Sequence, residues 1–171
     1  MCRNRLSGFS LIELMITIAV LAVLLAIGLP SFQGSLRSNR LATSTNELIA
    51  TMSLARSEAI RNVRGAMVCP SEDGEACSVT PDWNEGWIVW RDLDGSGAAS
   101  SDEVMRYVQP KRQMQISGPA SIDFDSRGRV PAGLATITLE PEDCDGRALR
   151  RTVQIRVTGQ VAKSQELEEC E

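Results

Sequence analysis

The chain has 171 residues, with 18 Lys plus Arg against 22 Asp plus Glu and a formal net charge of −4 at pH 7. It contains no histidine, which removes the commonest general base and the Ser-His-Asp arrangement of hydrolases. An acidic surface also repels polyanions. We therefore expect a protein that is not an enzyme and that needs no cofactor, with a length suited to one ordinary domain beyond its N-terminal segment.

An apolar stretch occupies the N-terminal region. Residues Phe9 to Leu29 carry a single charge, Glu13, and a helix of this length rises about 1.5 Å per residue and so matches the ~30 Å core of a bilayer. Arg3 and Arg5 are the only charges before it. Because short basic flanks stay in the cytoplasm, we expect one membrane span with the following residues exported.

A cleaved secretory signal is the alternative for this stretch, since Ala26 and Gly28 lie near its end. The apolar run is longer than the ~7 to 15 residues of a typical signal core. A charged Glu13 inside it would also cost roughly 2 to 3 kcal/mol on an insertion scale. Both features favour a retained segment.

The string Gly8-Phe9-Ser10-Leu11-Ile12-Glu13 resembles the processing site of type IV prepilins and type II secretion pseudopilins. This resemblance implies that a prepilin peptidase cuts between Gly8 and Phe9, that leader 1–8 is lost, that Phe9 is N-methylated and that Glu13 directs assembly. A new α-amino cation at Phe9 would give a buried Glu13 carboxylate of another subunit the partner it needs.

The same resemblance sets the expected location and partners. It implies an inner-membrane protein with a single span and a periplasmic C-terminal domain, which later enters a filament. Its partners would be other pilins or pseudopilins, the prepilin peptidase and the inner-membrane assembly platform. Pro30 matches a helix-kinking proline of the family, and together with Gly28 it predicts a kink or local melting.

Two periodicities follow the apolar stretch. Near-helical spacing predicts an amphipathic helix over residues 30–65, ending between Asn62 and Gly65, with one stripe expected to be buried: Leu41, Leu48, Met52, Ala55 and Ala59. Near-alternating segments then predict strands at 66–69, 87–91, 104–108, 121–124, 135–139 and 152–157. We therefore expect an α+β protein: a helix over 9–29 and 30–65, then a β-rich domain over 66–171 whose antiparallel sheet packs on one helix face.

Four cysteines lie in the predicted exported part, because Cys2 belongs to the leader: Cys69, Cys77, Cys144 and Cys170. In an oxidising compartment they predict disulfides. Three connectivities exist, and proximity in sequence favours Cys69 with Cys77 and Cys144 with Cys170. Metal binding is disfavoured, because the chain has neither a CxxC pair nor a histidine.

One acidic segment has the spacing of a twelve-residue calcium loop, with Asp92, Asp94 and Ser96 at positions 1, 3 and 5 and Glu103 at position 12. Such loops normally join two helices. This one lies between two predicted strands, so we assign no metal and keep calcium as an alternative.

The segment from Cys69 to Asp92, with its Trp83-Asn-Glu-Gly-Trp87-Ile-Val-Trp90 core, resembles the GspH/FimT group. This resemblance implies a minor pilin of a type IV pilus that acts in initiation or at the tip and supports pilus biogenesis and motility or DNA uptake. The alternative within the group is pseudopilin H of type II secretion. We expect the three tryptophans to be core residues.

Some members of this group bind DNA through a C-terminal Gly-Arg-x-Arg motif. This chain has Gly159-Gln160-Val161-Ala162 at the corresponding place, so the motif is absent. Cations nearby are nevertheless candidate phosphate contacts: Arg147, Arg150, Arg151, Arg156 and Lys163. A DNA-binding competence pilin is therefore a further alternative.

Overall fold

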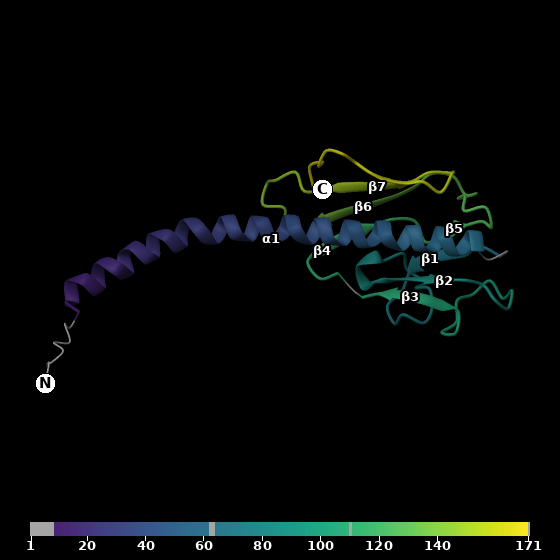
Figure 1. The fold of residues 1–171 in the computed structure, drawn as a ribbon, viewed down its shortest axis with the longest axis horizontal. Coiled ribbons are helices and arrows are strands. Elements are labelled where there is room, and N and C mark those ends of the chain that lie inside the picture. Colours follow the sequence, from purple (N-terminus) through teal and green to yellow (C-terminus); the bar gives the residue numbers. More distant parts are fainter. Residues whose placement is uncertain (1–8, 62–63, 110, 171) are drawn as a thin grey trace, which may run out of the picture. The chain divides into compact units, whose positions relative to one another are not determined.

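The computed structural model describes residues 9–61, 64–109 and 111–170. They form one long helix, α1 (Leu11–Arg61), followed by eight strands and a short 3-10 helix (Figure 1). The chain divides into two compact units, one ending at Arg37 and the other beginning at Ser38. The α+β class expected from the sequence is confirmed.

The first unit consists of the N-terminal part of α1. Its segment of α1 is long and apolar enough to cross a membrane, and its large apolar side chains are exposed from Phe9 to Leu29. The helix assignment runs through Gly28 and Pro30 without interruption. Among the described residues α1 is therefore helical on both sides of the proline, and a kink there stays a prediction.

In the second unit, α1 buries the predicted stripe. Leu41, Leu48, Met52, Ala55 and Ala59 are all buried, which confirms the periodicity. Glu58, which is not part of this stripe, is also buried. The Arg61 guanidinium pairs with it one turn later, and this pairing offsets the cost of burying a carboxylate.

The chain leaves α1 through a close turn at Gly65. Its φ of +89° lies in the left-handed region, and a Cβ there would be 2.4 Å from the carbonyl oxygen of Phe124. Only glycine satisfies both conditions without strain. The turn therefore sets the direction of the first strand.

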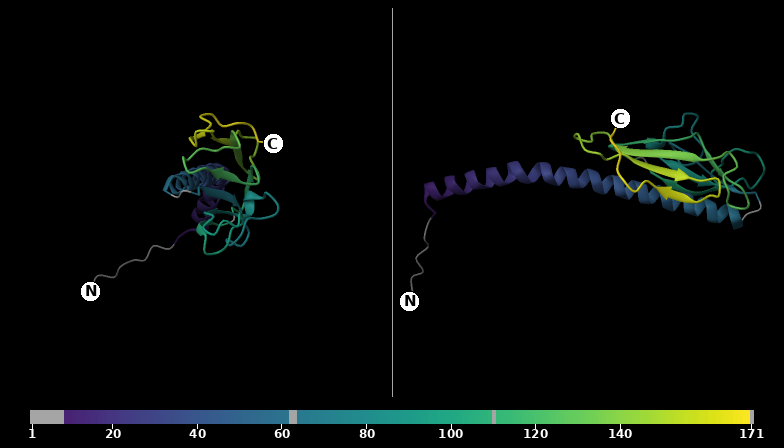
Figure 2. Two further views of the ribbon diagram at one scale, coloured as in Figure 1. Left: turned by 90° about the vertical axis from the view of Figure 1, so that its right-hand side faces the viewer. Right: turned by 90° about the horizontal axis from the view of Figure 1, so that it is seen from above.

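The strands form two four-stranded antiparallel sheets rather than the single sheet expected. The first has the order β3-β2-β1-β5 and contains β1 (Ala66–Pro70), β2 (Trp87–Trp90), β3 (Val104–Val108) and β5 (Ile122–Phe124). The second has the order β4-β6-β7-β8 and contains β4 (Met114–Ser117), β6 (Ala135–Pro141), β7 (Arg151–Ile155) and β8 (Val161–Lys163). Strands of both sheets run alongside the part of α1 in this unit (Figures 1 and 2).

All six predicted strands are present, with bounds that differ by no more than two residues at either end. The sequence did not predict β4, β8 or the 3-10 helix η1 (Trp83–Glu85). Both missed strands are short, at 4 and 3 residues, and too few alternating positions fall in such a segment to define a period. β4 pairs along the free edge of β6, and β8 pairs along the free edge of β7, so the two short strands complete the second sheet.

The core lies between α1 and the two sheets. Trp87 and Val89 of β2 join the main cluster, whereas Ile88 and Trp90 join a smaller cluster on the other face of that sheet. Side chains alternate across a strand, so all four residues of β2 are buried. Trp83 belongs to the main cluster, and the expectation that the three tryptophans are core residues is confirmed.

Candidate assembly site

The start of α1 carries a helix cap built from residues of the proposed processing motif. The backbone N–H of Glu13 donates to the Ser10 hydroxyl at 3.3 Å, and the N–H of Leu14 donates to the Ser10 carbonyl at 3.2 Å. This is the Ser-x-x-Glu pattern of a capping box. The sequence analysis did not predict this cap, although its spacing is visible, because the same residues form the proposed processing and assembly motif.

The cap places Glu13 in the first turn of the helix. Both Glu13 and Phe9 are exposed, and Phe9 retains 78% of its accessible surface. A carboxylate in the first turn also interacts favourably with the positive end of the helix dipole. The geometry therefore leaves Glu13 available to a group outside the chain. Gly8 and leader 1–8 lie outside the described residues, so processing and methylation stay predictions.

The apolar side chains that follow Glu13 form a continuous exposed surface. None of the most apolar 18-residue window of α1 is buried inside the structure. Monomeric soluble proteins rarely expose apolar patches beyond a few hundred Å², so this segment needs a bilayer or the helices of other subunits around it.

Both expected disulfides are present. Cys69 bonds to Cys77, with their Cα atoms 5.6 Å apart, and Cys144 bonds to Cys170, with theirs 6.5 Å apart. The second bridge closes 26 residues and holds the C-terminal segment, where the Glu168 backbone also pairs with Arg150. The disulfides therefore fix the β1–η1 loop and the C-terminal segment.

The β2–β3 loop brings the candidate calcium ligands together. One carboxylate oxygen from each of Asp92, Asp94 and Glu103 lies within 4.8 Å of the others. These carboxylates already accept backbone N–H bonds: Asp92 from Gly95, Asp94 from Ser96, and Glu103 from Leu93. Ser96 donates its hydroxyl to the Ala98 carbonyl. The site is thus a hydrogen-bonded loop between strands, and calcium binding stays a prediction.

Glu103 is the centre of this loop. Its side chain is buried and accepts from the Leu93 N–H at 2.6 Å and from the Ser100 hydroxyl at 3.0 Å. The Leu93 N–H, more than any other contact, holds the pKa of the Glu103 carboxyl below its usual value. The same cause, an N–H bond from Ser96, lowers the pKa of Asp94. Both groups therefore favour their charged forms.

The candidate DNA contacts do not converge on one place. Arg151 begins β7 and pairs with Leu139, whereas Arg156 follows the last residue of β7, Ile155, which pairs with Ala135. At about 3.3 Å per residue the two arginines are roughly 16 Å apart along the strand. Arg147 lies in the loop held by the second disulfide, Arg150 pairs with the Glu168 backbone, and Lys163 ends β8. DNA contact by these residues stays a prediction.

A capped apolar helix that joins a disulfide-bonded domain of two antiparallel sheets defines a pilin-type subunit. Comparison with family models supports this class, since the prokaryotic N-terminal methylation motif matches residues 3–29. The model of the type II transport protein GspH matches residues 44–159, more than half of the chain. The chain belongs to this GspH family of structural pilins. Comparison with curated protein sequences gives no match.

Solved structures of the same class share the fold. The type IV minor pilin FimU of Pseudomonas aeruginosa is similar with a TM-score of 0.57 at 21% identity, over 74% of this chain and 89% of the other. The minor pseudopilin EpsH from the Type 2 Secretion System of Vibrio cholerae is similar with a TM-score of 0.50 at 14% identity, over 73% of this chain and 96% of the other. Both similarities show the fold alone.

Proposed function

We propose that this chain is a minor pilin of a bacterial type IV pilus, which acts without catalysis by entering the filament during initiation or at its tip. The observation that carries the proposal is the exposed apolar surface of α1 from Leu11 to Leu29, headed by Glu13 in the first turn. Such a surface is stable only in a membrane or among other apolar helices.

The proposed mechanism has two stages. Before processing, Phe9 to Leu29 spans the inner membrane and the domain lies in the periplasm. After a prepilin peptidase cuts between Gly8 and Phe9, the methylated α-amino group of Phe9 is a cation, and Glu13 of one subunit pairs with Phe9 of another. Since an unpaired buried charge is costly, this pairing favours one register of helices as the assembly platform extracts the subunit.

The second candidate is pseudopilin H of a type II secretion system, which would use the same processing and pairing. The family model favours it by its description as a type II transport protein. The similar solved structures, one of a pilus protein and one of a secretion protein, do not separate the two candidates. The two candidates differ in the filament that the helix enters and in the cellular process that depends on it.

Deletion of the gene separates these candidates. We expect loss of twitching motility and of surface pili, with secretion intact, and recovery of both when the gene is restored. Loss of secretion with normal twitching would favour the pseudopilin instead. If both processes remained at wild-type levels, neither function would stand.

A further inference from the structure

We propose that a groove beside α1 in the second unit docks a carboxylate-bearing surface of a neighbouring filament subunit. This inference rests on the proposed function, since it concerns contacts between subunits of one filament. It adds a contact made by the exported domain to the contact that Glu13 makes in the filament core.

The groove has a volume of about 440 Å³ and lies between α1 and the segment that enters β8. Its lining contains the aliphatic side chains of Ile49, Ile60 and Val161. Ile60 keeps 55% of its surface exposed although it lies on a packed helix. The remaining lining residues are polar or small: Ser53, Arg56, Ser57, Gly159 and Gln160. The three aliphatic residues of this lining suit aliphatic side chains of a protein partner.

Arg56 is a cationic residue of the groove lining, and one of its N–H donors lacks an acceptor in the described part of the chain. Its Nε is buried and has no hydrogen-bond partner among the described residues. The Gly159 turn closes over it: a Cβ at Gly159 would lie 3.0 Å from Arg56 Nε and 1.9 Å from the Gly128 carbonyl oxygen. A buried donor without an acceptor is costly, but the Gly159 turn covers this atom. What a partner meets in the groove is the positive charge of the half-buried Arg56, which favours a carboxylate.

Two turns next to the groove, at residues 125–129 and 156–160, add positive charge. Arg127 and Arg156 are exposed, and neither has a carboxylate partner within the described part of the chain. The turns adjoin, because the Val130 N–H donates to the Val157 carbonyl at 2.9 Å. By contrast, Arg129 is neutralised by Asp125 at 2.8 Å. Arg56 therefore lines the groove, and two further cations lie on the adjoining turns, in a chain whose net charge is −4.

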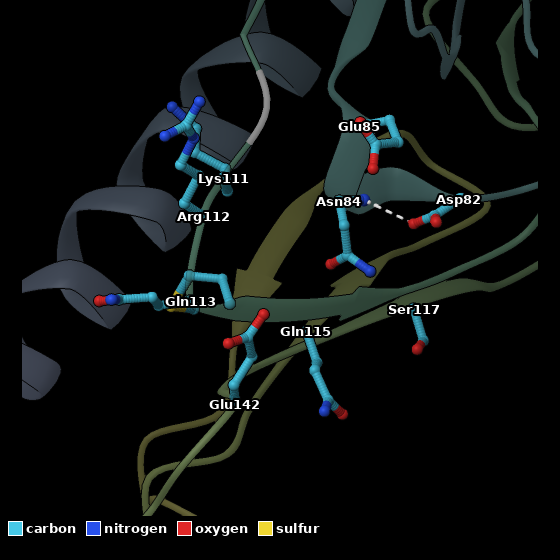
Figure 3. Close-up of a pocket in the computed structure, with 10 residues that line it drawn as sticks. Asp82, Asn84, Glu85, Lys111, Arg112, Gln113, Gln115, Ser117 and Glu142 are labelled. Carbon is cyan, nitrogen blue, oxygen red and sulfur yellow. Dashed lines mark hydrogen bonds between the residues drawn. The ribbon is translucent and has the colours of Figure 1, made fainter.

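The other end of the same domain shows the complementary charge. Two cavities of about 780 and 500 Å³ lie there, and six acidic residues against three basic ones line them: Asp82, Glu85, Glu142, Asp143, Asp145 and Glu169 against Lys111, Arg112 and Arg147. Figure 3 shows Glu85, Asp82 and Glu142 around the larger cavity.

These two regions are separated along α1. Arg40 donates to Gln113, which lines the acidic cavity, whereas Arg56 and Ile60 line the groove. A helix covers about 30 Å between positions 40 and 60. A contact between unlike ends is head-to-tail, and it extends a stack of subunits unless its rotation closes a ring. The expected occupant is therefore a pilin-type subunit that presents an acidic end of this kind.

The test uses the full-length chain in its own cells, with a photo-crosslinking residue in place of Ser57, an exposed groove residue. We expect a crosslinked product that contains a pilin-type subunit, either this chain or another, identified by mass spectrometry. Arg127→Glu with Arg156→Glu should reduce its yield at least fivefold, because both side chains are exposed and their reversal repels carboxylates without disturbing the core. Arg56→Gln should also reduce it.

Two matched controls accompany these variants. Lys163→Glu reverses an exposed cation outside the groove and should leave the yield unchanged. A crosslinker at Gln154, exposed on β7, should give a product that does not respond to the arginine variants.

Unchanged crosslinking in the Arg127→Glu/Arg156→Glu variant would overturn the inference, and so would a crosslinked partner that is DNA or a protein of another class. The sheared filament fraction separates this failure from failure of the proposed function. A wild-type chain present in filaments, with crosslinking insensitive to the arginines, would refute only the docking groove. A wild-type chain absent from every filament would refute the proposed function itself.

Discussion

The backbone N–H of Glu13 donates to the hydroxyl of Ser10 at 3.3 Å, so the residue expected to direct assembly is also part of a helix cap. The two roles use different atoms. Capping uses the Glu13 main chain, whereas assembly would use its carboxylate. Substitutions can therefore separate them.

Ser10→Ala removes the capping hydroxyl and leaves the Glu13 carboxylate in place. Loss of such a cap typically costs about 1 kcal/mol, so hydrogen exchange of the amides in the first turn of α1 should become roughly fivefold faster in detergent micelles. Ser53→Ala is the control, because the Ser53 hydroxyl donates to the Ile49 carbonyl inside the helix and lies far from the first turn. Equal protection in the wild type and Ser10→Ala would contradict the capping role.

Thr51 connects α1 to the first sheet. Its buried hydroxyl accepts from the Trp87 indole N–H at 3.2 Å, and Thr51→Val would leave that N–H buried without an acceptor. We expect a loss of about 1 to 3 kcal/mol in the free energy of unfolding, measured by denaturant titration of the full chain in detergent. Thr43→Val, at an exposed position of the same helix, should change stability by much less. A comparable loss in both variants would argue against the hydrogen bond.

The Cys144–Cys170 bridge closes a loop of 26 residues, and loop entropy predicts that it contributes about 3 kcal/mol. The double variant Cys144→Ala/Cys170→Ala should therefore unfold at lower denaturant concentration and release the C-terminal segment to proteolysis near β8. Arg147→Ala, in the same exposed loop, should retain wild-type resistance. Full resistance in the double cysteine variant would show that backbone pairing alone holds this segment.

Glu103 makes the β2–β3 loop sensitive to acid. Because its folded pKa lies below the unfolded one, its stabilisation is present above the unfolded value of about 4.3 and is lost as the pH falls through the folded pKa. Glu103→Gln should therefore lower stability at pH 7 and flatten the decline of stability in acid. The profile should be followed by thermal unfolding from pH 7 to pH 3.

Glu75→Gln serves as the control for this profile, since Glu75 is an exposed side chain of another loop. It should reproduce the wild-type pH profile. An acid decline of unchanged steepness in Glu103→Gln would mean that other carboxylates account for it.

Several elements could be predicted because their signals are long or chemically specific. The buried stripe of α1 repeats over five positions, and the N-terminal string matches the methylation motif in residue type and spacing. The disulfide pairs could be predicted because each cysteine lies close in sequence to its partner, at separations of 8 and 26 residues. In each case the information lies within a short stretch of sequence or in a repeated pattern.

Other features depended on contacts between distant segments. Nothing local shows that β4 and β8 flank β6 and β7 to make a second sheet, because strand pairing is set by side chains far apart in sequence. The burial of Glu58 likewise depends on the packing around it and on Arg61. The groove at Arg56 was not predicted either, since the glycine turn that closes it lies about 100 residues later.

The Glu13 carboxylate is proposed to direct assembly. Glu13→Gln tests this role, with Glu13→Asp as the variant that keeps the charge. The measurement is the amount of each variant in sheared filaments relative to the amount in the membrane. Since removing one partner of a buried ion pair costs about 3 to 5 kcal/mol, we expect Glu13→Gln to be processed and membrane-inserted normally, but at least tenfold depleted from filaments. Glu13→Asp should retain more incorporation than Glu13→Gln. Wild-type incorporation of Glu13→Gln would contradict the pairing of Glu13 with Phe9.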